Sequence, residues 1–198
     1  MVIYFARLVS FLFNPYFLII PVPYLLVLRE TGDGVIAMQW TLFSLFFLAI
    51  VGIAVFVLFK RGYFSDLDIS KKEQRPLFFL LVCVFAICYF LGLFYLRGPL
   101  VLFISLSGLF FSLLVFSFLV TKVKASIHVA TITAMIFSFS VLYGGQFFLL
   151  LFLIPLIGWS RIKIHRHTWI EVMVGAVLGI VIPVVMFVVF KVLLHVSL

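Results

Sequence analysis

The sequence predicts an all-α polytopic membrane protein, a transmembrane helical bundle of six or seven membrane segments forming one domain over residues 1–198. Composition is the first reason, because 67% of the residues are hydrophobic and only 10% are charged. The mean hydropathy of +1.42 is higher than a water-exposed surface allows. The apolar residues also fall into long runs separated by short polar stretches, as in helices that cross a bilayer.

The first two spans are expected at residues 8–28 and 36–59. Three prolines interrupt the first of these runs. Because proline removes a backbone donor and bends a helix, we expect a kinked first span. No small-residue cleavage site ends this run, so it is interpreted as a retained span rather than a signal peptide.

The remaining apolar runs predict five more segments: 77–96, 99–120, 126–142, 147–159 and 168–195. Only Arg97-Gly98-Pro99 separates the first two of these, which indicates a tight hairpin. The 147–159 run has thirteen residues, enough only for a thin or tilted path across the bilayer. The count is therefore six or seven, and we expect seven.

The basic residues predict the orientation of these segments. The formal net charge is +8, but the basic residues occupy short loops rather than a water-exposed stripe, so nucleic acid is not an expected partner. With seven segments, the loops 60–76, 121–125 and 160–167 share one membrane face with the N-terminus. That face carries eleven of the fourteen lysines and arginines, which predicts that it is cytoplasmic, most simply at the plasma membrane.

The stretch SRIKIHRHTWIE, residues 160–171, crowds two arginines, a lysine, two histidines and a glutamate between two apolar runs. It holds His167 and Glu171, which are four residues apart and would be neighbours on one face of a helix. A carboxylate in that place accepts the Nδ1–H of the imidazole, fixes its tautomer and leaves Nε2 free to attack. The pair therefore predicts a nucleophilic histidine.

Two other polar groups face the same side in this topology. Ser126 and His128 open the 126–142 span, where unpaired helical N–H groups and the helix dipole favour an anion. Arg75 stands before Pro76, which holds this cation at the mouth of its span. Cations, hydroxyls, histidines and a carboxylate together suit the binding and transfer of a phosphoryl group.

These residues resemble the motifs of the type 2 phosphatidic acid phosphatases (PAP2), the membrane lipid-phosphatase branch of the superfamily that includes the vanadium haloperoxidases. The most specific family motif is Ser-Arg-x5-His-x3-Asp. It is matched here by Ser160, Arg161, His167 and Glu171, with glutamate in place of aspartate. The region of resemblance is 66–179.

The two other family motifs are matched in part. Pro-Ser-Gly-His keeps Ser126 and His128, while alanine and isoleucine replace the proline and the glycine. Lys-x6-Arg-Pro keeps Arg75 and its proline, but Asp68 occupies the lysine position. Two nearby lysines are candidates for the missing charge: Lys71 and Lys72.

The resemblance implies a metal-independent lipid phosphatase that needs no cofactor. In that role His167 attacks phosphorus and becomes phosphorylated, Glu171 orients it, and His128 protonates the leaving oxygen. The phosphoryl oxygens would be held by Arg75, Ser126, Ser160, Arg161 and Lys71 or Lys72. The expected partners are the bilayer and a lipid substrate with a phosphate head group: phosphatidate, phosphatidylglycerophosphate or a polyprenyl phosphate or diphosphate.

Simpler interpretations remain open at this stage. Lysines and arginines beside a span usually determine topology, and a non-catalytic protein of the same fold would bind or transport anionic lipids. His165 is a rival nucleophile, but it is six residues from Glu171 and misses the family spacing. Gly175 and Gly179 form a small-xxx-small pattern that predicts close helix packing in the last span.

Overall fold

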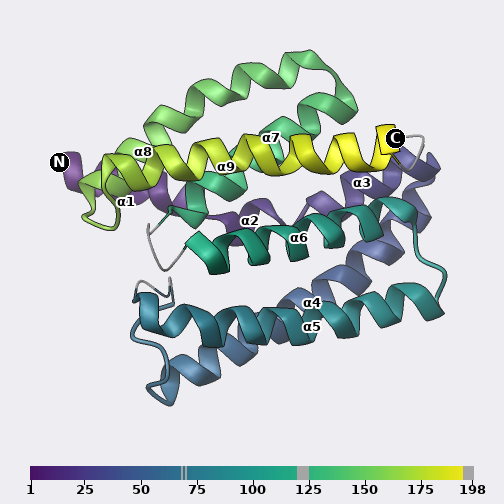
Figure 1. The fold of residues 1–198 in the computed structure, drawn as a ribbon, viewed down its shortest axis with the longest axis horizontal. Coiled ribbons are helices and arrows are strands. Elements are labelled where there is room, and N and C mark those ends of the chain that lie inside the picture. The colour runs from purple at the N-terminus through teal and green to yellow at the C-terminus, as the bar shows by residue number, and fades with distance from the viewer. Residues whose placement is uncertain (68, 70, 120–124, 194–198) are drawn as a thin grey trace. The chain divides into compact units, whose positions relative to one another are not determined.

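The structure is a computed structural model that describes residues 1–67, 69, 71–119 and 125–193. Within these residues the chain is helical and contains no strand, which confirms the all-α prediction (Figure 1). The chain divides into two compact units, each described by itself. The first unit is Met1–Ile19 with Phe118–Leu198, and the second unit is Ile20–Ser117.

The second unit is built from α3 (Val22–Thr31), α4 (Gly34–Lys60), η1 (Lys72–Gln74), α5 (Arg75–Tyr95) and α6 (Leu100–Leu119), whose last residues pass into the first unit. Its core lies where α3, α4, α5 and α6 meet: Val27, Ala37, Ala86, Leu93, Leu102 and Leu106. Glu30 joins two of these helices, because its carboxylate accepts the N–H groups of Leu100 at 3.0 Å and Val101 at 2.7 Å. The end of α3 thereby caps the start of α6.

The predicted hairpin between α5 and α6 is confirmed, because α5 ends at Tyr95 and α6 begins at Leu100. The N–H of Gly98 donates to the Leu93 carbonyl at 2.8 Å and closes the end of α5. A Cβ atom at Gly98 would lie 2.8 Å from the Leu93 side chain and 3.0 Å from that of Trp40. Glycine is therefore the residue that fits this turn.

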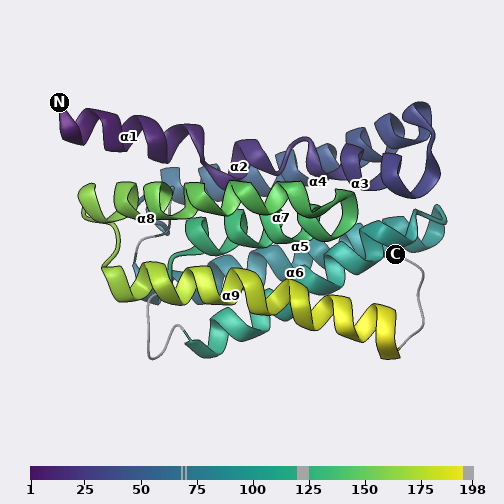
Figure 2. The same ribbon diagram turned by 90° about the horizontal axis from the view of Figure 1, so that it is seen from above.

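The first unit contains α1 (Val2–Leu12), α2 (Pro15–Leu18), α7 (Ile127–Tyr143), η2 (Gly145–Phe152), α8 (Leu153–Lys163), α9 (Trp169–Phe187) and the π-helical turn η3 (Val188–Leu193). Figures 1 and 2 show α9 running alongside α7, and Figure 2 shows α8 beside α1. The buried core of this unit is Val129, Ile132, Ile136, Ile154, Ile157 and Val172. It therefore joins α7, α8 and the start of α9.

Five helical segments are long and apolar enough to span a membrane: α4, α5, α6, η2–α8 and α9–η3. A sixth is added when Val2–Leu18 and Val22–Thr31 are taken as one broken span. The chain is thus a multi-pass helical membrane protein, as predicted. The predicted span at 126–142 is the exception. Its helix, α7, has 17 residues and rises only about 26 Å, so it is shorter than the other membrane-spanning segments.

The helical segment at 147–159 is longer than the sequence predicts. It lies in a continuous segment, Gly145–Lys163, of 19 residues, because a 3-10 helix precedes α8 without a break. A 3-10 helix rises more per residue than an α-helix, so this segment covers more distance than thirteen α-helical residues would. The predicted interruption of the first run is also present: α1 ends at Leu12, and Asn14 caps α2 by accepting the Tyr16 N–H at 3.0 Å.

Candidate functional site

The end of α8 is closed by the backbone of the loop that follows it. The N–H of Arg166 donates to the Arg161 carbonyl at 3.0 Å, and that of His165 to the Ile162 carbonyl at 2.9 Å. This is a Schellman motif, and His165 has the left-handed φ of 57° at the position where glycine is usual. The N–H of His167 also donates to the Arg161 carbonyl, at 3.3 Å. The loop therefore ties His167 to the last turn of α8.

The side chains of His167 and Glu171 are in contact, with 2.8 Å between Nδ1 and Oε2. The imidazole is 7% exposed and the carboxylate 19%. A carboxylate partner at Nδ1 favours the tautomer that carries its proton there. The contact was predicted, but helical spacing is not its cause. His167 precedes Thr168, the N-cap of α9, and so lies outside the helix.

Glu171 has a second role in the same turn. Its backbone N–H donates to Thr168 Oγ1 at 3.4 Å, and its Oε2 accepts the Thr168 N–H at 3.3 Å. These two bonds form a capping box, so one carboxylate oxygen meets both Thr168 and His167. Thr-x-x-Glu before an apolar run is the sequence signature of this box. Thr168 could therefore be predicted from the sequence, although it belongs to none of the phosphatase motifs.

The start of α7 is joined to the first turn of α9. The backbone N–H of Ser126 donates to the Glu171 carbonyl at 3.0 Å. Such an approach requires glycine on α9, because a Cβ atom at Gly175 would lie 2.6 Å from the Ser126 carbonyl oxygen. One turn later, a Cβ atom at Gly179 would lie 2.5 Å from the Ala130 carbonyl oxygen. The packing role predicted for these glycines is confirmed.

Ser126 occupies the N-cap of α7, as predicted, but its hydroxyl makes no cap hydrogen bond. The side chain is fully buried, and within the described residues Oγ has no hydrogen-bond partner. A buried hydroxyl without a partner costs about 1–3 kcal/mol, which makes this group a candidate to bind an oxygen of a ligand. His128 follows in the first turn of α7 and is also buried, at 9% exposure.

Ser160 and Arg161, near the end of α8, are both buried. Nη1 of Arg161 donates to Oγ of Ser10 in α1 at 2.8 Å. Ser160 directs its hydroxyl hydrogen to the Ile157 carbonyl of its own helix, at 2.7 Å. Its role as a donor to phosphate stays a prediction. Ser10 lies outside every motif, and no pattern in the sequence distinguishes it from other serines in apolar runs.

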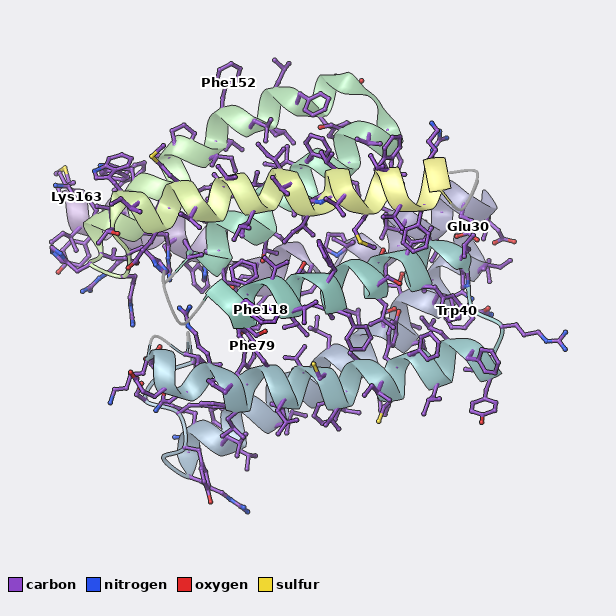
Figure 3. The ribbon with its side chains drawn as sticks, in the orientation of Figure 1. Glu30, Trp40, Phe79, Phe118, Phe152 and Lys163 are labelled. Atoms are coloured by element: carbon purple, nitrogen blue, oxygen red, sulfur yellow. The ribbon has the colours of Figure 1, made fainter. Side chains whose placement is uncertain are left out.

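These bonds gather the start of α7, the end of α8 and the start of α9 at one end of the first unit. Figure 3 labels Lys163, the last residue of α8, at this end of the unit. These helix ends and the loop between α8 and α9 carry the predicted site residues Ser126, His128, Arg161, His167 and Glu171. Imidazole, carboxylate, guanidinium and hydroxyl groups are the kinds of side chain that phosphoryl transfer through histidine uses.

Three predicted phosphate ligands belong to the second unit. Arg75 is buried as the first residue of α5, followed by its proline, as predicted for the start of that span. Lys71 is exposed, and Lys72 opens η1. Asp68, at the family's lysine position, lies outside the described residues. The participation of these three cations in the site stays a prediction.

The fold defines the class of this chain as a multi-pass α-helical integral membrane protein. No protein-family model, curated protein or solved structure matches it. Within residues 1–67, 69, 71–119 and 125–193, no three His, Cys, Asp or Glu side chains are grouped so that they can hold a metal ion.

Proposed function

We propose that this chain is a membrane-embedded phosphatase that hydrolyses a lipid phosphomonoester or diphosphate through a phosphohistidine intermediate. The observation that carries the proposal is the contact of 2.8 Å between His167 and Glu171. A carboxylate that accepts the Nδ1–H keeps Nε2 available as a nucleophile and stabilises the positive charge that the imidazole gains on attack. The resemblance of this segment to the PAP2 motif supports the same assignment.

In the first step, Nε2 of His167 attacks phosphorus, so that a P–N bond forms while the P–O bond to the lipid breaks. The leaving oxygen takes a proton from the imidazolium of His128. In the second step, water attacks phosphorus, the P–N bond breaks, and His128 takes back a proton from the water. Arg161 and Ser126 bind the phosphoryl oxygens, over which charge is spread in the transition state.

The position of the candidate groups favours a lipid substrate over a soluble ester. They lie at the ends of apolar helices, and the ends of membrane-spanning helices are where lipid head groups are expected. Trp169, the first residue of α9, is 59% exposed, and exposed tryptophan at a helix end is typical of the membrane interface. The phosphate can then reach the site while the acyl or prenyl chain stays in the bilayer.

The test is phosphate release from the full chain in detergent, with phosphatidate, phosphatidylglycerophosphate and a polyprenyl diphosphate as substrates. We expect His167→Ala to lower kcat by at least about 1000-fold, as loss of a nucleophile does. His165→Ala is the matched control, because this histidine is in the same loop but exposed. Its activity should stay near that of the wild type.

A second measurement identifies the intermediate. Rapid quenching during turnover of a phosphate-labelled lipid should leave label on the protein that is stable to alkali and labile to acid, as phosphohistidine is. His167→Ala should carry none. Turnover that persists in His167→Ala contradicts the nucleophile assignment. Binding of phosphatidate by a wild-type chain that releases no phosphate instead favours a lipid-binding protein.

A further inference from the structure

The first helix of the chain packs on α8 through one of its faces. The buried residues of α1 are Ala6, Val9 and Ser10, three and four residues apart, as on one side of a helix. Near this face, the rings of Phe5 and Trp159 lie 6.0 Å apart. Figure 2 shows α8 beside α1 along this contact. The helix is therefore part of the same packed unit as the candidate site.

The one polar side chain on this buried face contacts a predicted phosphate ligand. Ser10 is 7% exposed and Arg161 is 4% exposed, and 2.8 Å separates Ser10 Oγ from Arg161 Nη1. A hydrogen bond between a charged donor and a neutral acceptor is strong where water is excluded. Because the guanidinium is planar, a bond at Nη1 also restricts the plane in which its other N–H groups point.

Other buried serines of this unit behave differently. Ser140 donates to the Ile136 carbonyl and Ser160 to the Ile157 carbonyl, each at 2.7 Å and within its own helix. This is how serine usually satisfies its hydroxyl in an apolar helix. Ser10 instead accepts a bond from a helix distant in sequence. The contact of Ser10 therefore affects the orientation of the Arg161 side chain rather than the hydrogen bonding of α1.

We infer that Ser10 is a positioning residue of the phosphate site, which holds the Arg161 guanidinium in the orientation that binds a tetrahedral oxyanion. The inference rests on the proposed function and adds the first helix to the site, outside the region of motif resemblance. Arg161 is fixed at two points, by its backbone to His167 and by its side chain to Ser10. Such fixing keeps a cation ready for the anion before it arrives.

The experiment measures orthovanadate binding and lipid-phosphate hydrolysis by the full chain in detergent, for the wild type, Ser10→Ala, Ser10→Thr and Ser140→Ala. We expect Ser10→Ala to weaken vanadate binding about tenfold, because the Arg161 guanidinium is no longer held in the orientation that binds the anion. In lipid-phosphate hydrolysis, we expect Ser10→Ala to lower kcat/KM. Ser10→Thr keeps the hydroxyl and should restore binding to within about threefold of the wild type.

Ser140→Ala is the matched control, because this serine is buried in the same unit and bonded only to its own helix. Its vanadate affinity should be unchanged, although its melting temperature falls. A merely structural Ser10 would lower the melting temperature of Ser10→Ala and leave the affinity of the folded protein unchanged, which overturns the inference alone. A wild-type chain that neither binds vanadate nor releases phosphate overturns the proposed function and this inference together.

Discussion

The backbones of Ser126 and Glu171 are joined by a hydrogen bond of 3.0 Å, from the serine N–H to the glutamate carbonyl. This bond connects Ser126, whose buried hydroxyl has no hydrogen-bond partner among the described residues, to Glu171, whose carboxylate contacts His167. The connection is possible because Gly175 of α9 leaves room for the Ser126 carbonyl. Helix packing and the geometry of the candidate site therefore depend on the same contact.

A methyl group at Gly175 should disturb both the packing of α7 on α9 and the geometry of the candidate site. Its Cβ atom would lie 2.6 Å from the backbone oxygen of Ser126, which cannot move aside as a flexible side chain can. We expect Gly175→Ala to lower the free energy of unfolding by about 2 kcal/mol, a value typical of overpacking. Hydrolysis should fall as well, because α7 must shift away from Glu171. Thermal unfolding and phosphate release in detergent measure the two effects.

Gly52 provides the control for this variant. It lies within α4, and a Cβ atom there would meet nothing within 4 Å. Gly52→Ala should therefore be neutral or stabilise the protein by up to about 1 kcal/mol, through the better helix propensity of alanine. Equal stability changes in Gly52→Ala and Gly175→Ala would contradict the close approach of α7 and α9.

Much of the fold was predictable because apolar runs have a direct physical meaning in a membrane protein. Within the described residues, helices account for most of each predicted run, and the hairpin at Gly98 lies where a tight turn was expected. The number of full-length spans was less predictable, since the helix at 127–143 is short and a 3-10 helix extends the next one. Neither property is determined by hydropathy alone.

His165 occupies the left-handed position that ends α8, with a φ of 57°. A residue with a Cβ atom is strained there, and glycine is not. We expect His165→Gly to raise the free energy of unfolding by about 0.5–1 kcal/mol and to leave phosphate release unchanged. Denaturation followed by fluorescence, together with the hydrolysis assay, checks both statements. A loss of activity in this variant would return His165 to the list of catalytic candidates.

The candidate site was predictable only in part, for a physical reason. His167, Glu171 and Ser126 follow from local spacing, and local spacing is what a sequence displays. Ser10 could not be found in that way, because its contact with Arg161 joins residues 151 positions apart. A long-range contact of this kind depends on how α1 packs on α8, and one serine in an apolar helix does not reveal it.

The two roles of Glu171 can be separated by substitution. Glu171→Gln removes the charge that stabilises the imidazolium of His167, so kcat should fall by about 100-fold or more. Thr168→Ala removes only the side-chain half of the capping box and should lower the free energy of unfolding by about 1 kcal/mol. Its kcat should stay within about threefold of the wild type, since His167 keeps its carboxylate partner. Similar kcat losses in both variants would mean that capping, not charge, is what Glu171 provides.

Substitution of Ser126 should give effects of opposite sign on stability and on binding. Its Oγ is fully buried and has no hydrogen-bond partner within the described residues, so the hydroxyl destabilises the unliganded protein. We expect Ser126→Ala to leave the free energy of unfolding unchanged or to raise it by up to about 1 kcal/mol. The same variant should bind orthovanadate about tenfold more weakly, because one donor to the anion is lost. Thermal unfolding with and without vanadate measures both quantities in one experiment. A lower melting temperature without vanadate would show that the hydroxyl serves the fold, and an unchanged vanadate-induced shift would remove Ser126 from the phosphate site.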